Sequence, residues 1–122
     1  MARILICDNE APLRLLVRAT LEPAGYELEE AVDGDEALAV SERFRPDLIV
    51  LDMMMPGRSG LEVLAALRGS PALAATRVVL LTARTQASDR AQAHAAGADR
   101  FLAKPFSPAE LERVVVGLLE AS

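Results

Sequence analysis

The sequence has little cysteine and no long apolar run. Its single cysteine, Cys7, excludes an intramolecular disulfide framework and a thiolate metal cage. A lone thiol inside an apolar run is typical of a small core residue. No apolar stretch approaches the length of a transmembrane helix, and the one near the N-terminus is too short for a signal peptide. These absences favour a soluble protein in the reducing cytoplasm.

Positive charge is also scarce. The chain has 13 Lys and Arg against 18 Asp and Glu, a net charge of -5, and no cluster of Lys and Arg. Because phosphate contacts need a basic face, we expect no direct nucleic-acid binding. With 122 residues, 52% of them hydrophobic, the chain is long enough to form one domain, residues 1–122, around its own core.

Apolar runs and capping patterns predict alternating strands and helices. The strongest runs are continuous, which indicates strands covered on both faces, as in a parallel sheet. Between the runs, Asp33–Glu36 and Ser107–Glu110 have the pattern of capping boxes, and Ser59 can cap another helix. This order predicts an α/β fold, a (βα)5 three-layer sandwich with a five-stranded parallel sheet. The runs are Ile4–Cys7, Tyr26–Ala31, Leu48–Leu51, Val78–Leu81 and Phe101–Ala103.

Polar residues follow four of the five runs. In open parallel sheets, ligands bind beyond the carboxyl ends of the strands, which share one edge. We therefore expect these polar side chains to converge on one pocket, to which the second run contributes nothing comparable. They are Asp8, Asn9 and Glu10 after the first run, Asp52 after the third, Thr82 after the fourth and Lys104 after the fifth.

The residue types of this pocket suit a phosphoryl group. Neighbouring carboxylates repel each other unless a positive charge lies between them. Oxygen ligands without His or Cys suit a hard cation, and Mg²⁺ takes few protein ligands plus water. The ammonium of Lys104 and the hydroxyl of Thr82 can hold an oxyanion. A carboxylate can itself accept the group and form an aspartyl-phosphate.

Four segments, in this order and spacing, resemble the receiver domain of two-component response regulators. They are "ILICDNEAPLR", "PDLIVLDMMMPGRSG", "LLTA" and "AGADRFLAKPF", and together they extend over essentially the whole chain. The resemblance implies a single-domain, chemotaxis-regulator-like protein with the flavodoxin-like strand order 2-1-3-4-5. Met1, directly before the first run, suggests a native start, although a receiver cut from a longer protein is the alternative.

The resemblance also implies roles for individual residues. Asp52 would be the phosphoacceptor that attacks a phosphohistidine. Asp8 and Asn9 occupy the acidic-pair positions that bind Mg²⁺, and Met54 would add its backbone carbonyl to the metal ligands. Thr82 would bind phosphoryl oxygens.

Lys104, like Thr82, would bind phosphoryl oxygens. Phe101 occupies the aromatic switch position, which would turn inward as Thr82 moves toward the phosphate. Lys104 and Pro105 match a lysine–proline pair whose peptide bond is usually cis. The output surface of the family corresponds to the fourth helix, fifth strand and fifth helix, roughly Ala87–Leu119.

The implied partners follow from these roles. A sensor histidine kinase or phosphotransfer protein would donate the phosphoryl group, and a downstream protein would bind the output surface. Such a domain is not a classical enzyme, because it phosphorylates itself from a phosphodonor in the presence of Mg²⁺ and dephosphorylates itself. We expect a monomer or a weak dimer.

One residue departs from the family pattern and keeps an alternative open. Asn9 stands where the family usually has Asp, so the pocket holds two carboxylates rather than three and Mg²⁺ affinity should fall. A degenerate receiver that binds a partner without phosphorylation is the alternative. A phosphatase of the haloacid dehalogenase type needs a second Asp where Met54 stands. A flavodoxin-like cofactor carrier needs a phosphate loop that the first run lacks.

Each residue also has a purely structural interpretation. Asp8 and Asn9 are favoured residue types for capping the following helix. Asp52 could be a turn residue, Thr82 an ordinary strand residue, and Lys104 a solvated surface lysine. Phe101 could simply pack in the core.

Overall fold

The computed structural model describes residues 1–83, 91 and 94–120 of the chain. Its five strands are all parallel and lie in the order β2-β1-β3-β4-β5. The predicted α/β architecture and strand order are confirmed. The strands are β1 (Arg3–Cys7), β2 (Glu27–Ala31), β3 (Leu48–Asp52), β4 (Arg77–Ala83) and β5 (Arg100–Lys104).

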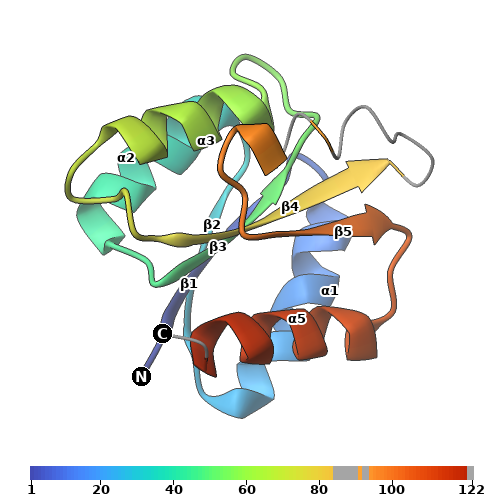
Figure 1. Ribbon diagram of the computed structural model, residues 1–122. Coiled ribbons are helices and arrows are strands. Elements are labelled where there is room, and N and C mark those ends of the chain that lie inside the picture. The colour runs from blue at the N-terminus through green and yellow to red at the C-terminus, as the bar shows by residue number, and fades with distance from the viewer. Residues whose placement is uncertain (84–90, 92–93, 121–122) are drawn as a thin grey trace.

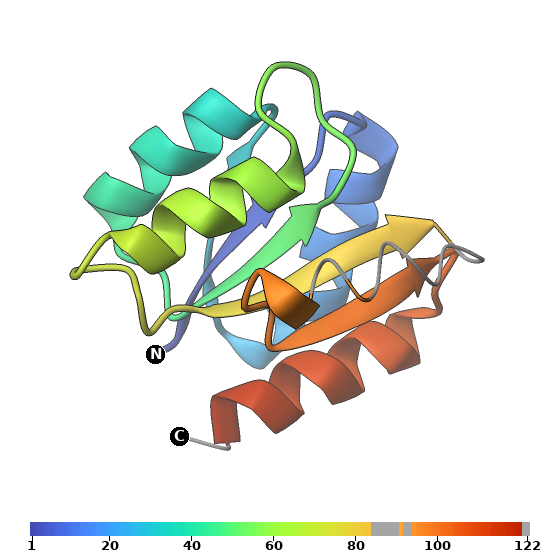
Figure 2. The same cartoon turned by 45° about the horizontal axis from the view of Figure 1, so that its top comes forward.

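Helices cover both faces of the sheet. In Figures 1 and 2, α1 and α5 lie on one face, and α2 and α3 lie on the other. The predicted fourth helix, and with it the first part of the expected output surface, falls largely outside the described residues. The described helices are α1 (Ala11–Leu21), α2 (Gly34–Phe44), α3 (Gly60–Gly69) and α5 (Pro108–Glu120), with a short 3-10 helix at Glu22–Ala24.

Local capping explains where several helices begin. Ser59 and Glu62 form a reciprocal capping box at the start of α3. Ser107 and Glu110 exchange the same pair of hydrogen bonds before α5. At α2, Asp33 accepts from the Glu36 amide as predicted, but the Glu36 carboxylate bonds the amide of Val32, one residue earlier than a capping box requires.

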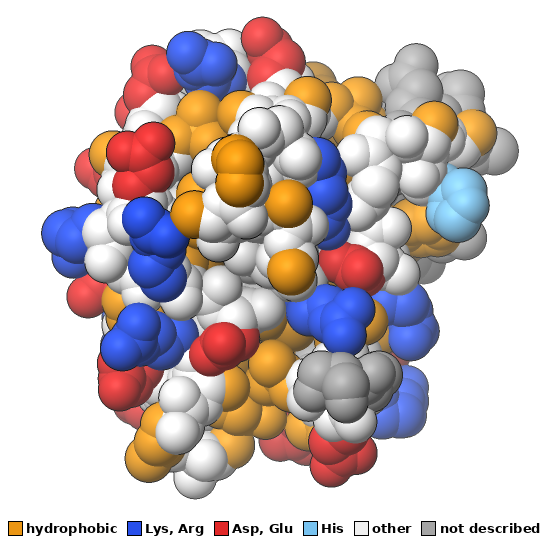
Figure 3. All heavy atoms as spheres, turned by 60° about the vertical axis from the view of Figure 1, so that its left-hand side comes forward, with side chains coloured by type: hydrophobic (Ala, Val, Ile, Leu, Met, Phe, Trp, Pro, Cys, Tyr) orange, Lys and Arg blue, Asp and Glu red, His pale blue; other side chains and the backbone are white. Residues whose placement is uncertain are grey.

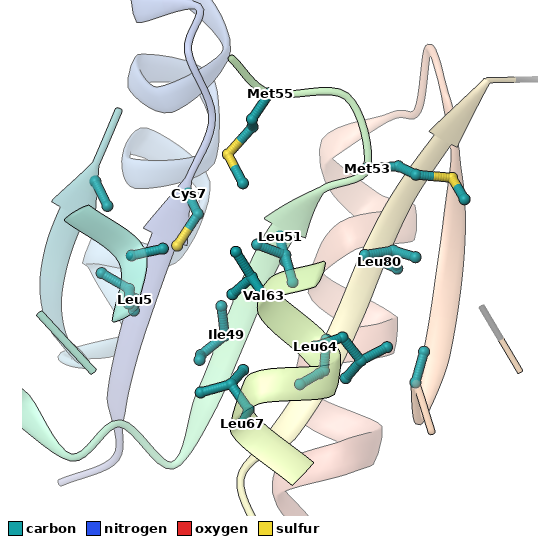
Figure 4. Packing of buried hydrophobic residues seen from close by; sticks show 14 of the residues in the cluster. Leu5, Cys7, Ile49, Leu51, Met53, Met55, Val63, Leu64, Leu67 and Leu80 are labelled. Atoms are coloured by element: carbon teal, nitrogen blue, oxygen red, sulfur yellow. The ribbon is translucent and has the colours of Figure 1, made fainter. Parts of the chain in front are cut away.

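The continuous apolar runs divide between two cores, because successive side chains of a strand point to opposite faces. Leu5, Cys7, Ile49, Leu51 and Leu80 belong to the core between the sheet and α2 and α3, and Figure 4 shows Ile49 and Leu51 beside the side chains of α3. The intervening residues of the same strands, from Ile4 to Leu81, pack against α1 and α5. Cys7 is fully buried, and burial raises the pKa of its thiol, which fits the predicted core role.

One arginine ties the connections at the far end of the sheet together. Arg68, in the last turn of α3, donates to the carbonyl oxygens of Thr76 at 2.7 Å and Ala74 at 3.1 Å. It also donates to the carbonyl oxygen of Gly97 at 2.8 and 3.0 Å and to Asp99 at 3.0 Å. A single planar guanidinium thus joins two loops that are far apart in the sequence.

We predict that Arg68→Ala lowers the free energy of unfolding by about 3 kcal/mol, because several carbonyl oxygens lose a charged donor at once. Urea denaturation measures this change. Arg43→Ala is the matched control, since Arg43 is exposed and, among the described residues, makes only a 3.7 Å ion pair with Glu29. It should change stability by less than about 0.5 kcal/mol. Equal losses in the two variants would contradict the prediction.

Candidate functional site

The carboxyl ends of the strands bring the predicted polar residues together. Asp52 is the last residue of β3, Lys104 is the last residue of β5, and Thr82 lies one residue before the end of β4. Asp8 directly follows β1. Figure 2 shows the arrowheads of β3, β4 and β5 directed to the same edge of the sheet. This convergence was predicted from the sequence, because the carboxyl ends of parallel strands lie at the same edge of a sheet.

Lys104 bridges two buried carboxylates. Its Nζ lies 3.1 Å from Asp52 Oδ2 and 3.3 Å from Asp8 Oδ2. Asp8 is 1% exposed and Asp52 is 4% exposed. A third carboxylate, that of Glu10, lies 3.9 Å from the same ammonium but is largely exposed to solvent. The positive charge therefore lies between two acids that would otherwise repel each other.

Each buried carboxylate is also held by the backbone. The amide of Met54 donates to Asp52 Oδ1 at 3.2 Å, and the amide of Glu10 donates to Asp8 Oδ1 at 2.7 Å. The amide of Asp8 donates to the carbonyl oxygen of Ala31 in β2 at 3.1 Å. The bonds from the amides of Met54 and Glu10 fix Oδ1 of each acid, and Oδ2 of each acid faces Lys104.

The helix-cap interpretation of Asp8 and Asn9 does not hold. The N-cap residue of α1 is Glu10, and no side chain caps it. The Asp8 carboxylate bonds the amide of Glu10 itself, not an amide inside the helix. The side chain of Asn9 is exposed, whereas that of Asp8 is buried.

Electrostatics perturb both main groups of the pocket. Burial, followed by the charge of Asp8, raises the pKa of Asp52, and Lys104 offsets part of that rise. For Lys104, burial alone would lower the pKa, but the charges and hydrogen bonds of Asp52 and then Asp8 outweigh it and raise the pKa above its usual value. Lys104 therefore stays charged at neutral pH, while ionisation of Asp52 opposes folding.

Thr82 supplies an unused polar atom. Its side chain is 1% exposed, and its Oγ1 has no hydrogen-bond partner in the described part of the chain. A buried hydroxyl without a partner costs free energy, which a bound oxyanion would relieve. The unpartnered hydroxyl therefore favours a role for Thr82 in binding an oxyanion over its interpretation as an ordinary strand residue.

The structure also places the remaining predicted residues. The side chain of Met54 is exposed beside Asp52. Phe101 is half-buried and packs against the core on the α2–α3 side of the sheet. The peptide bond between Lys104 and Pro105 is cis.

Sequence reasoning missed an arginine behind the pocket. Arg14, in the first turns of α1, donates from NH1 to the carbonyl oxygen of Asp8 at 2.7 Å and from Nε to Glu30 of β2 at 3.0 Å. The second strand, which was expected to contribute nothing, thus reaches the pocket indirectly. The signal available in the sequence was the position of Arg14, which places it in the first turns of the helix that follows the first strand.

The fold and the pocket define a parallel α/β domain that presents a buried aspartate beside a bridging lysine at the carboxyl edge of its sheet. The family model described as "Response regulator receiver domain" matches residues 4–116. The chain belongs to the response regulator receiver domain family of two-component signalling, and the resemblance seen in its sequence motifs is confirmed.

Curated relatives are longer than this chain. The transcriptional regulatory protein ResD of Bacillus subtilis is 43% identical over 117 residues, which are 96% of this chain and 48% of ResD. The phosphate regulon transcriptional regulatory protein PhoB of Pseudomonas aeruginosa is 43% identical over 108 residues, 88% of this chain and 47% of that protein. The chain thus spans about half the length of these relatives.

Solved structures of similar length have the same fold. The chemotaxis protein CheY4 of Vibrio cholerae superposes with a TM-score of 0.91 at 36% identity, covering 97% of this chain and 98% of its own. A putative response regulator from Chloroflexus aurantiacus gives a TM-score of 0.93 at 32% identity, with 98% of both chains covered.

We predict that Asp52→Asn stabilises the folded domain at pH 7. The pKa of Asp52 is raised above its ordinary value of 3.8, so the folded state binds this proton more tightly than the unfolded chain does. The contribution of Asp52 to stability is therefore fully present below pH 3.8 and is lost as pH rises through the raised pKa of this carboxyl. The gain in unfolding free energy from Asp52→Asn should be complete above the raised pKa and absent below pH 3.8.

Urea midpoints of both proteins across this pH range test the prediction. Asp35→Asn is the control, because Asp35 is exposed and, within the part of the chain that the structure describes, pairs only with Arg58, at 2.8 Å. It should shift stability by less than about 0.5 kcal/mol. A lower midpoint for Asp52→Asn than for the unchanged protein at pH 7 would contradict the sign of the predicted effect.

Proposed function

We propose that this domain accepts a phosphoryl group on Asp52 from the phosphohistidine of a sensor histidine kinase or phosphotransfer protein. The observation that carries the proposal is the bridge from Lys104 to two buried carboxylates, Asp8 and Asp52, beside the unpartnered hydroxyl of Thr82. Receiver domains as a family interact with such kinases and with downstream targets.

The proposed transfer uses groups already present in the pocket. A carboxylate oxygen of Asp52 attacks phosphorus, the bond from phosphorus to the histidine nitrogen breaks, and the imidazole leaves with that electron pair. Lys104 exchanges its contact with the Asp52 carboxylate for a phosphoryl oxygen, and Thr82 donates its hydroxyl to another. The amide of Met54 keeps Asp52 oriented through its other oxygen.

The residues of the pocket fit a Mg²⁺ ion with few protein ligands. Asp8, Asp52 and the backbone carbonyl of Met54 would hold the ion, and water would complete its six oxygen ligands. When bound, Mg²⁺ neutralises charge on the transferring phosphoryl group. Within the described residues no group of three or more His, Cys, Asp and Glu side chains could hold a metal, so the proposed ion would rely on two carboxylates and a backbone carbonyl.

The exposed side chain of Asn9 is the one feature that favours a receiver without phosphorylation. Against it, Asp8, Asp52 and Thr82 are all buried, and Lys104 is held between the two acids. Buried polar groups reduce stability unless they serve a purpose. A binding module that never carries phosphate would have no need of all four.

Surface properties support the expected partners. On the face shown in Figure 3, Lys and Arg side chains alternate with Asp and Glu side chains. We therefore propose protein partners rather than nucleic acid for this domain, with the downstream target bound through β5, α5 and the preceding segment. None of the described helices is both long and apolar enough to span a bilayer. The lone buried cysteine is compatible with a cytoplasmic location.

The first test is phosphorylation by a small donor. Incubation with acetyl phosphate and Mg²⁺ should add one phosphoryl group, read as intact mass, and Asp52→Asn should add none. If neither acetyl phosphate nor a phosphorylated histidine kinase labels the protein at any Mg²⁺ concentration, the phosphoacceptor proposal fails and the phosphorylation-independent module takes its place.

We further predict that Asn9→Asp lowers the Mg²⁺ concentration needed for half-maximal labelling. The substitution restores a negative charge at the metal end of the pocket, and ligand charge helps to set divalent-cation affinity. We expect a change of roughly tenfold, within the range that ligand charge gives. The conservative control is Asn9→Gln, which adds no charge and should not lower the requirement.

A further inference from the structure

We propose that Arg14 is a positioning residue that holds the Asp8 backbone, and through it the Asp8 carboxylate, in place for the metal. The inference rests on the proposed function, because it assigns Asp8 to the metal end of the pocket. Among the residues that the structure describes, Arg14 makes no direct contact with Asp52 or Lys104. It acts through one bond, from its NH1 to the carbonyl oxygen of Asp8 at 2.7 Å.

The peptide groups around Asp8 are held from two sides. The amide of Asp8 donates to Ala31 in β2 at 3.1 Å, and its carbonyl accepts from Arg14 on α1. The Asp8 carboxylate then bonds the amide of Glu10 and the ammonium of Lys104. Without the Arg14 contact, the Asp8 carbonyl loses its charged donor, so the peptide group after Asp8 and the direction of the Asp8 carboxylate are held less firmly.

Glu30 explains why Arg14 can serve this role. The Arg14 side chain is 16% exposed, and its Nε donates to Glu30 Oε1 at 3.0 Å. Glu30 binds a second arginine with its other oxygen, which accepts from Arg18 Nε at 2.7 Å. A guanidinium is planar and rigid, so a carboxylate on one edge fixes where its other edge points. The carboxylate of β2 thereby aims Arg14 at Asp8.

Arg18 provides a built-in comparison. It lies one helical turn beyond Arg14 on the same face of α1 and shares Glu30 with it. Its other contacts among the described residues are with the carbonyl oxygen of Leu28 at 3.5 Å and the exposed Glu22 at 3.5 Å, both remote from the pocket. Loss of Arg18 thus removes a similar ion pair but leaves the Asp8 carbonyl bonded.

The departure at Asn9 increases the weight on Asp8. An amide in the acidic pair brings no charge, so Asp8 and Asp52 supply all the negative charge of the buried pocket. Groups that orient metal ligands without touching the metal commonly change affinity 10–100-fold when removed. In this chain, the orientation of one of only two charged ligands depends on Arg14.

The test measures Mg²⁺ binding to the unphosphorylated protein, alongside labelling by acetyl phosphate. Amide NMR shifts of residues 8–10 give the Mg²⁺ dissociation constant. We expect Arg14→Ala to raise that constant about tenfold. It should raise the Mg²⁺ requirement for labelling in parallel, while the labelling rate at saturating Mg²⁺ changes little. The Mg²⁺ dissociation constant of Arg14→Lys should lie between those of the unchanged protein and Arg14→Ala, because an ammonium cannot bond Asp8 and Glu30 with one planar group.

Arg18→Ala is the matched control, and urea denaturation reports the stability of every variant. The inference holds if Arg14→Ala weakens Mg²⁺ binding while Arg18→Ala, at similar loss of stability, does not. It is wrong if both variants weaken binding equally, or if Arg14→Ala and Arg14→Lys bind Mg²⁺ like the unchanged protein. If Arg14→Ala does not fold, Arg14→Lys decides alone. If the unchanged protein is not labelled but Arg14→Ala still weakens Mg²⁺ binding, the result counts against the proposed function only.

Discussion

The placement of one ammonium group between two buried acids governs the rest of the pocket. Lys104 comes from the last position of β5, Asp52 from the end of β3, and Asp8 from just beyond β1, yet Nζ lies within 3.3 Å of both carboxylates. Two acids at 1% and 4% exposure would repel strongly without that charge. The parallel sheet makes the arrangement possible, because every strand ends at the same edge. Asp8 and Asp52 are almost fully buried at that edge, so their interactions with Lys104 act at a lower effective dielectric than in water.

The balance of charge in the pocket also prepares a response to phosphate. Burial and Asp8 raise the pKa of Asp52, so the ionised acceptor is held at a cost to stability. Thr82 keeps a buried hydroxyl without a partner among the described residues. A phosphoryl group on Asp52 would offer oxygens to Lys104 and Thr82 at once, and a ligand shifts a conformational equilibrium only by such differential contacts. Asn9 moderates this balance, because it removes one charge from the pocket and one ligand charge from the metal.

A second layer of contacts supports the pocket from behind. The carboxylate of Glu30 in β2 fixes Arg14, and Arg14 fixes the Asp8 carbonyl, so the edge strand takes part in a site to which it offers no side chain directly. At the opposite end of the sheet, Arg68 ties the loops after α3 and before β5. Both arginines use the same property, a rigid planar fork that bonds two partners from separate segments.

The sequence by itself determined the family, the strand order that it implies and the edge where the polar residues meet. Continuous apolar runs require a sheet covered on both faces, and strand ends in a parallel sheet share one side. Capping at Ser59 and Ser107 was predictable because it depends on residues three positions apart. Only the tertiary structure decided that Lys104 reaches both acids, that Thr82 is left without a partner, and that Arg14 and Glu30 support Asp8. The contact between Arg14 and Glu30 joins residues 16 positions apart, and that between Lys104 and Asp8 joins residues 96 positions apart. No local pattern records which side chains meet when two distant segments pack together.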